Sequence, residues 1–221
     1  MLTSTMTFDD LPQTLPIFPL DKCLLLPGGL LPLNIFEPCY LKMVDDALAG
    51  HRMIGVVQPD KDLREKGHKD AIYKTGCAGR ITQFNETDDG RYLITLSGLN
   101  RFRIAEEIST VLAYRQVKPN WNAFPDDMVE DCESLHIDRD AMMPLLERYF
   151  ALFDMSCDWD IMRGAPCNTL MATLPMICPF TSQEKQALLE TVGLNDRYEK
   201  FMALLQMSLN ESSGLTSSIK H

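Results

Sequence analysis

The chain has 221 residues, of which 45% are hydrophobic and 24% are charged, and these shares are typical of a globular protein with one large domain or two small ones. Its formal net charge of −10 disfavours nucleic acid as a partner, because non-specific affinity for a phosphate backbone comes mainly from Lys and Arg. No window reaches the roughly 18 uninterrupted apolar residues of a membrane span, and the first residues lack the pattern of a signal peptide, so we expect a cytoplasmic protein.

Short apolar runs separated by turn residues predict a strand-rich first part of the chain. A helix is expected from Pro38 to Gly50, because proline suits the first helical position and glycine is a common stop. The charged run at 60–70 predicts a loop. Strands are predicted for LPIFPL (15–20), CLLLP (23–27), LPLNIF (31–36) and MIGVVQP (53–59).

A hairpin follows, in which residues 71–86 and 91–108 flank an Asp89-Gly90 turn. Alternation in the second strand places Tyr92, Ile94 and Leu96 on one face and Leu93, Thr95 and Ser97 on the other. Gly76 and Gly79 predict a bulge in a small, curled, barrel-like sheet, which residues 113–121 would close.

Helical spacing replaces strand patterns after Pro119. It predicts helices over Asp126–Phe153, over Asn168–Ile177, from a Thr181/Glu184 capping box to Gly193, and over Asn195–Leu209. The expected organisation is a flexible N-terminus (1–14), a β-rich subdomain (15–122), an α-helical subdomain (123–209) and a disordered tail (210–221).

No candidate for catalysis or phosphate binding has both the residue spacing and the sequence context that its motif requires. Gly28-Gly29 lacks the further glycine, lysine and hydroxyl residue of a P-loop, so it predicts a tight turn. Ser182 and Lys185 spell the S-x-x-K pattern of a serine nucleophile activated by lysine, but their place behind a capping threonine favours a helix start. The sequence therefore predicts no catalytic site.

The possible metal ligands and the basic residues of this chain are expected to have structural or surface roles. The four histidines (His51, His68, His136, His221) lie in unrelated contexts, and the acidic run at 126–140 lacks the spacing of a calcium loop, so we expect no metal and no cofactor. The seven scattered cysteines are expected to be buried free thiols in a reducing compartment, although a hydrolase built on Cys and His stays open in principle. Arg101 and Arg103 are expected to lie on the solvent side of a half-buried strand.

In order and spacing, several runs resemble the N-terminal domain of Lon protease, often called its substrate-binding domain. The resemblance covers about residues 15–205 and is carried by LPIFPL, LLPGGLLPLNIFEPCYLKMVDDAL, IGVVQP, TGCAGRI, DGRYLITLSGLNRFRI, YRQVKPNW and PFTSQEKQALLE. It implies an α+β fold, with a β-rich, PUA-like pseudo-barrel followed by a C-terminal helical bundle. It also implies a stand-alone, non-catalytic module, since Lon's ATPase and Ser-Lys peptidase have no counterpart in these runs.

The resemblance also implies a function, the binding of protein or peptide segments, unfolded or damaged ones included, with a separate protease or chaperone as a possible partner. We predict Phe36, Glu37 and Tyr40 at the rim of a peptide groove, because the strand-to-helix corner presents them together; the alternative is that Phe36 and Tyr40 are core residues. Family members often have Arg where this chain has Cys39, so a basic contact is lost. Two other functions stay open: docking of one folded partner and, less favoured by the charge, RNA binding through the sheet.

Overall fold

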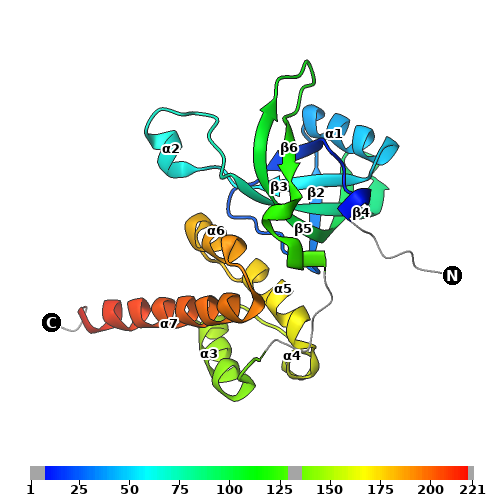
Figure 1. The fold of residues 1–221 in the computed structure, drawn as a ribbon. Helices are drawn as coiled ribbons and strands as arrows, with labels where there is room; N and C mark the ends of the chain where they lie inside the picture. Colours follow the sequence, from blue (N-terminus) through cyan, green and yellow to red (C-terminus); the bar gives the residue numbers. More distant parts are fainter. Residues whose placement is uncertain (1–7, 129–135, 219–221) are drawn as a thin grey trace.

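The computed structural model describes residues 8–128 and 136–218. A six-stranded sheet occupies the first part, and the helices of the second part gather below it (Figure 1). The strands are β1 (Leu15–Pro19), β2 (Leu30–Ile35), β3 (Met53–Val57), β4 (Thr75–Glu86), β5 (Tyr92–Ile108) and β6 (Gln116–Asn120). The α-helices are α1 (Pro38–Ala49), α2 (Lys61–Glu65), α3 (Arg139–Leu152), α4 (Trp159–Gly164), α5 (Cys167–Ile177), α6 (Ser182–Glu190) and α7 (Leu194–Ser218), and short 3₁₀ turns are η1 (Phe8–Asp10), η2 (Trp121–Ala123) and η3 (Pro125–Met128).

The sheet closes into the expected pseudo-barrel because the long strand β5 pairs with three other strands. The strand order is β2-β5-β4-β3-β1-β6, and an additional β5–β6 pairing joins the ring. The β1–β3 pair is parallel and the others are antiparallel. Strand β2 stays outside the ring and pairs with the first residues of β5, so the sheet carries a flap of three strands on one side.

One large ring of the barrel interior packs directly against glycine. Phe102 is fully buried, and a Cβ built on Gly55 or Gly76 would come within 2.8 Å of its ring. The predicted bulge is present, with a register shift between Ala78 and Gly79. Small residues at these positions therefore let the strands curl tightly around the ring.

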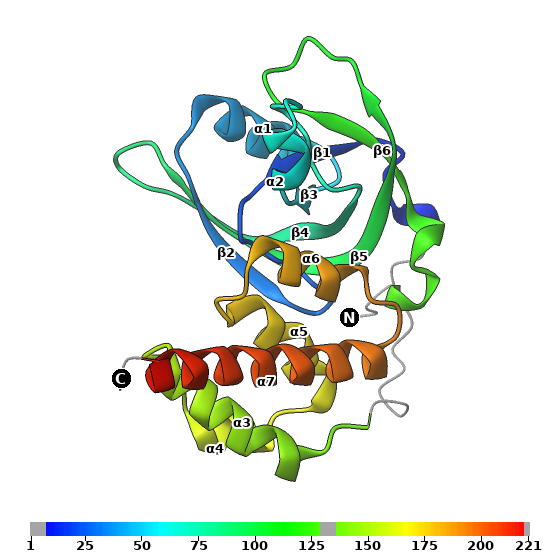
Figure 2. The same cartoon turned by 90° about the vertical axis from the view of Figure 1, so that its left-hand side faces the viewer.

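A second, larger core joins the outside of the barrel to the helices. It contains Leu24, Leu25 and Leu26 from the segment before β2, Met43 and Val44 from α1, and a larger group from the helical part: Met142, Leu146, Tyr149, Phe150, Leu170, Met171, Leu174, Leu188, Phe201 and Leu205. Helix α6 lies directly beneath the sheet, and α7 crosses below α5 and α6 (Figure 2). Both parts of the chain contribute residues to this core, so the predicted division into two subdomains at residue 122 stays a prediction.

The sequence prediction was wrong for two segments of the first part. CLLLP forms no strand: Leu24, Leu25 and Leu26 are buried, and the glycine turn that follows is held to β5 by hydrogen bonds from Gly28 N to Gly98 O (3.0 Å) and from Gly98 N to Gly29 O (2.8 Å). The charged run at 60–70 contains helix α2, whose first turn is capped by the side chain of Asp60.

The chain termini also differ from the prediction. Leu11, expected within a flexible N-terminus, is buried in the barrel core. Helix α7 continues through the expected disordered tail to Ser218, and hydroxyls of Ser208 and Ser212 return hydrogen bonds to carbonyls of the preceding turn. Residues 219–221 lie outside the described chain.

Among the helices, the long one predicted from Asp126 begins only at Arg139, where Asp138 caps it, and residues 129–135 lie outside the described chain. Helix α4 was not predicted. The Thr181/Glu184 capping box is confirmed, although α6 ends at Glu190 rather than at Gly193.

Candidate functional site

The three-stranded flap presents a hollowed outer face to solvent. The register sets Asn34 of β2 and Asn85 of β4 on either side of Leu93, and Pro32 beside Thr95. A hollow of about 430 Å³ lies here, lined by residues 32–34, 83–85 and 93–95. It combines an apolar floor with amide side chains that can hydrogen-bond to a ligand.

Several large apolar side chains on this face are exposed to solvent. Leu30 is 64% exposed, Phe36 is 62% exposed and Leu93 is 43% exposed. Alternation along β2 places Leu30 and Pro32 on the side of Leu93, and Phe36 follows directly after the strand. We call Leu30, Pro32, Phe36 and Leu93 the apolar strip. Clustered exposure of this kind is typical of surfaces that bind another molecule.

The three residues predicted for a groove rim have different surroundings. Phe36 is on the outer face, and the Cζ of Arg91 stands 5.9 Å from its ring centroid. Glu37 is the exposed residue before α1 and makes no side-chain cap. Tyr40 is half-buried with its ring 4.3 Å from that of Phe18, so it packs on the core, and burial raises its pKa. Phe36 and Glu37 are thus exposed, whereas Tyr40 shows only part of its surface to solvent.

Leu30, Pro32 and Leu93 were not predicted as site residues. A signal was present for Leu93, because alternation set it with Thr95 and Ser97 on the face opposite the core. A single leucine on a polar face did not stand out from ordinary surface residues.

The free edge of β2 is only partly available for a peptide backbone. Within the described chain, β2 pairs with β5 alone. Pro32, in the middle of β2, has no N–H, and proline in a strand is tolerated where its nitrogen faces away from the neighbour. A strand added at this edge would miss one donor at its centre, so the outer face offers more than the edge.

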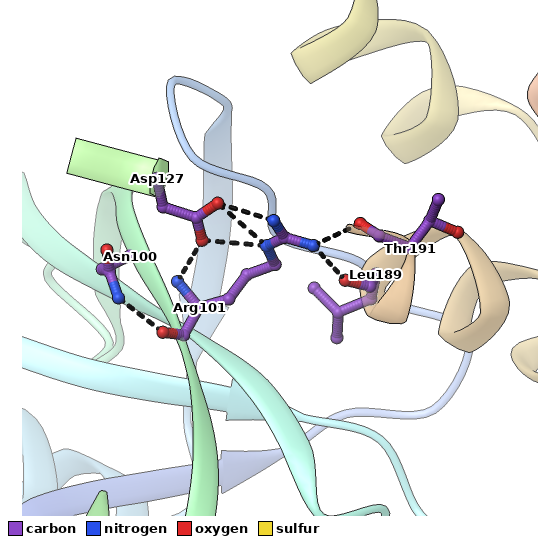
Figure 3. Close-up of polar contacts among 5 residues, drawn as sticks. All are labelled: Asn100, Arg101, Asp127, Leu189 and Thr191. Carbon is purple, nitrogen blue, oxygen red and sulfur yellow. Dashed lines mark hydrogen bonds and ion pairs between the residues drawn. The ribbon is translucent and has the colours of Figure 1, made fainter. Parts of the chain in front are cut away.

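A buried ion pair connects strand β5 of the barrel to η3, and its arginine also connects β5 to the end of α6 (Figure 3). The guanidinium of Arg101 on β5 meets Asp127 of η3 through Nε (2.8 Å) and Nη2 (2.6 Å), and its Nη1 donates to the carbonyls of Leu189 (2.8 Å) and Thr191 (2.6 Å). It also stands 4.2 Å from the ring centroid of Phe124. The expectation of a solvent-facing Arg101 was wrong, because the end of α6 covers it; Arg103 is exposed as expected.

A second buried guanidinium lies near this pair. Arg197 of α7 is 3% exposed, and burial, together with the positive charge of Arg101, lowers its pKa to about 10. It therefore stays charged near neutral pH, and the carboxylate of Asp127 attracts it as well as Arg101. This arrangement is structural, since every group of the Arg101–Asp127 pair is enclosed.

Comparison with known proteins decides which family this architecture represents. Residues 14–207 match the family described as the ATP-dependent protease La (LON) substrate-binding domain. The chain belongs to this family.

Relatives of the Lon domain are found across bacteria. The chain is 36% identical over 104 residues to a Lon protease of Flavobacterium johnsoniae, covering 47% of this chain and 13% of the relative. It is 26% identical over 226 residues to Lon protease 2 of Myxococcus xanthus, covering 96% of this chain and 26% of the relative. The chain thus spans about a quarter or less of the length of these relatives.

Solved structures show the same fold. A Lon N-terminal domain protein from Xanthomonas campestris aligns with a TM-score of 0.60 at 20% identity, covering 86% of this chain and 97% of that one. The N-terminal domain of a Mycobacterium avium complex Lon protease aligns with a TM-score of 0.59 at 18% identity, covering 89% and 98%. The pseudo-barrel and the helices after it are therefore the shared Lon-domain architecture.

The S-x-x-K pattern in this Lon domain does not form a serine–lysine pair. Ser182 Oγ donates to Asp21 (2.8 Å), and the ammonium of Lys185 donates to the carbonyl of Met176 (2.9 Å). Burial lowers the pKa of Lys185 and raises that of the neighbouring Cys23 thiol. Ser182 links α6 to the segment after β1, and Lys185 links α6 to α5. Ser182 is the first residue of α6, so the predicted helix start is confirmed.

Other candidate centres are equally structural within the described chain. No group of three or more metal-ligating side chains gathers among residues 8–128 and 136–218. Cys23, Cys39, Cys77, Cys157, Cys167 and Cys178 are free, and of these Cys77 and Cys178 are buried. None of the helices in this part of the chain combines the length and apolar character needed to cross a membrane.

A second hollow, of about 550 Å³, opens between the N-terminal segment and the end of α1. Its walls include residues 10–14, Asp46, His51 and Tyr114. Tyr114 OH donates to Asp46 (2.9 Å), and Asp46 also binds Lys42 (2.6 Å), so these two lining groups already have partners. It lacks the exposed apolar side chains of the flap.

Proposed function

We propose that this Lon domain is a non-catalytic module that binds exposed segments of unfolded or damaged proteins on the apolar strip. The observation that supports it best is the exposure of Leu30, Phe36 and Leu93 on one face beside a hollow. The family description, a substrate-binding domain of an ATP-dependent protease, supports the choice of protein segments as ligands.

Side-chain burial supplies the binding free energy in this proposal. Full burial of a Phe or Leu side chain contributes about 1.5–3 kcal/mol. Folded proteins keep such side chains inside, so an apolar strip selects chains that have lost their structure. Asn34, Gln83 and Asn85 border the hollow and can satisfy the amides of an extended backbone without a full strand ladder.

A titration with an unfolded model protein tests the proposal. The probe is a fluorescently labelled protein that has been reduced and alkylated so that it cannot refold. Phe36→Ser and Leu93→Ser should each weaken binding by about tenfold, since about 1.4 kcal/mol corresponds to that factor. The matched control is Ile161→Ser on α4, where the side chain is 71% exposed and far from the strip in sequence, and binding should not change.

Two outcomes would contradict the proposal. Equal affinity of both strip variants and the wild type would remove the strip from the site. Tight binding of the native form of the same probe would favour a docking platform for folded partners instead.

We further propose that the module acts in the cytoplasm and transfers the protein segments that it binds to a separate protease or chaperone. The bonding of Ser182 and Lys185 to other groups supports the absence of a peptidase centre in this domain. A casein-degradation assay with and without ATP should show no turnover by the purified chain, and turnover that persists after repurification would contradict the proposal.

A further inference from the structure

Carboxylates surround the Phe36 end of the apolar strip. Glu37 and the hairpin residues 86–91 carry four acidic side chains (Glu37, Glu86, Asp88, Asp89) and one basic side chain, that of Arg91. Arg91 is already bound by Asp89 at 2.8 Å. This end of the strip therefore keeps a negative excess.

The hairpin turn brings part of that charge to the Phe36 ring. Arg91 stands over the ring and is bound to Asp89, so Asp88 and Asp89 lie at the same end as Phe36. Glu37 is the next residue in the chain and is exposed. Carboxylates thus flank an aromatic side chain that is itself mostly open to solvent.

Arg91 shows which ligand chemistry this end accepts. A guanidinium over an aromatic ring is attracted by the negative face of the ring, and nearby carboxylates strengthen the attraction. Arg91 can cover only one side of Phe36, which remains 62% exposed. The uncovered part of the ring offers the same two interactions to a cation from another chain.

We propose that the site prefers protein segments that join an apolar stretch to a Lys or Arg, with the apolar side chains over Leu93 and Pro32 and the cation between Phe36 and the carboxylates of Glu37 and Asp88. This inference rests on the proposed function and adds a substrate class to it. Exposed rim charges contribute chiefly to selectivity and to the rate of encounter, so the preference should weaken with salt.

Three labelled peptides test the preference. They share one apolar core and carry flanks of Lys and Arg, of Ser, or of Asp and Glu. In fluorescence anisotropy at low salt, the basic peptide should bind at least about fivefold more tightly than the acidic one, and the ratio should shrink at high salt. The double variant Glu37→Gln/Asp88→Asn should reduce the ratio severalfold, whereas Asp160→Asn, at a carboxylate that is 97% exposed on α4, should leave it unchanged.

Phe36→Leu separates the aromatic contribution from the apolar one. It keeps apolar area but removes the ring, so the affinity for the basic peptide should fall by a larger factor than the affinity for the Ser-flanked peptide. Equal binding of all three peptides to the wild type would overturn this inference and leave the proposed function standing. Failure of every peptide to bind at high micromolar concentration would overturn both.

Discussion

At the scale of single residues, Arg101 and Asp127 form a buried ion pair in which the two side chains are 4% and 7% exposed. The partners that make this possible are the carbonyls of Leu189 and Thr191, which follow Arg101 by 88 and 90 residues. A local pattern contains no information about such distant groups, so the burial of Arg101 could not be predicted.

Arg101→Met should destabilise the fold by about 3–5 kcal/mol, because it leaves the carboxylate of Asp127 buried without its strongest partner. Urea unfolding measures this loss. Arg103→Met is the matched control on the same strand, and since Arg103 is exposed, its effect should stay within about 0.5 kcal/mol. A loss below about 1 kcal/mol in Arg101→Met would show that the pair is not a structural clamp.

Tyr114 predicts how stability changes in alkaline solution. Burial, together with the hydrogen bond to Asp46, raises its pKa to about 12. The unfolded chain releases this proton from about pH 10, while the folded chain keeps it, so folding stability is complete below pH 10 and falls as the pH rises to about 12.

Tyr114→Phe removes this contribution, so its stability should fall less steeply than that of the wild type between pH 10 and 12. Urea midpoints measured across that range check the difference. All six tyrosines have raised pKa values, so the comparison with the variant is needed. Parallel curves for the two proteins would contradict the assignment to Tyr114.

At the scale of elements, local signals were reliable where local contacts decide the structure. The Asp89-Gly90 turn, the Pro38 helix start and the Thr181/Glu184 capping box depend on neighbours within a few residues, and all were predicted. CLLLP has the composition of a strand, but it forms no ladder with a neighbouring strand. The Gly28-Gly29 turn that follows it is hydrogen-bonded to Gly98 of β5. Strand formation depends on a partner that composition does not reveal.

This docking predicts a large effect of one methyl group. A Cβ on Gly98 would fall on the carbonyl of Leu26, which is backbone and cannot rotate away. Gly98→Ala should therefore cost about 3 kcal/mol, at the upper end of the usual cost of overpacking. Gly164→Ala is the control, because nothing lies within 4 Å of its Cβ, and thermal unfolding of the two variants should differ clearly. Equal melting temperatures would contradict the close approach.

At the scale of the whole molecule, the barrel and the helices should unfold together. Apolar residues of both parts form one cluster, and the Arg101 contacts bridge them. The two tryptophans report on each part: Trp121 packs edge-on against Phe102 in the barrel (5.7 Å), and Trp159 lies against Phe150 in the helices (5.5 Å).

Single-tryptophan variants test this cooperativity. Trp159→Phe leaves the barrel reporter and Trp121→Phe leaves the helical one. In each variant, the fluorescence midpoint in urea should coincide with the midpoint from circular dichroism, as two-state unfolding requires. A fluorescence midpoint clearly apart from the circular-dichroism midpoint of the same variant would show that the barrel and the helices are separate folding units.

The fold was largely predictable from the sequence, whereas the candidate site was predictable only in part. Phe36 belongs to the apolar strip and Glu37 is exposed next to it, but Tyr40 is half-buried against Phe18, and Leu93 joins the strip through its register with Asn34. Register across three strands decides which side chains meet on the outer face, and a register shift between Ile81 and Gln83 changes the phase of β4. Such shifts are set by tertiary pairing and have no local signature.

Hydrogen–deuterium exchange in the presence of an unfolded, alkylated protein tests the central claim most directly, because it locates the ligand without a substitution. We expect slower exchange in residues 30–36 and 83–95 of the bound chain, and unchanged exchange in α4 and α7. Protection confined to the helices, or binding with no protection in the flap, would contradict the assignment of the apolar strip as the binding surface.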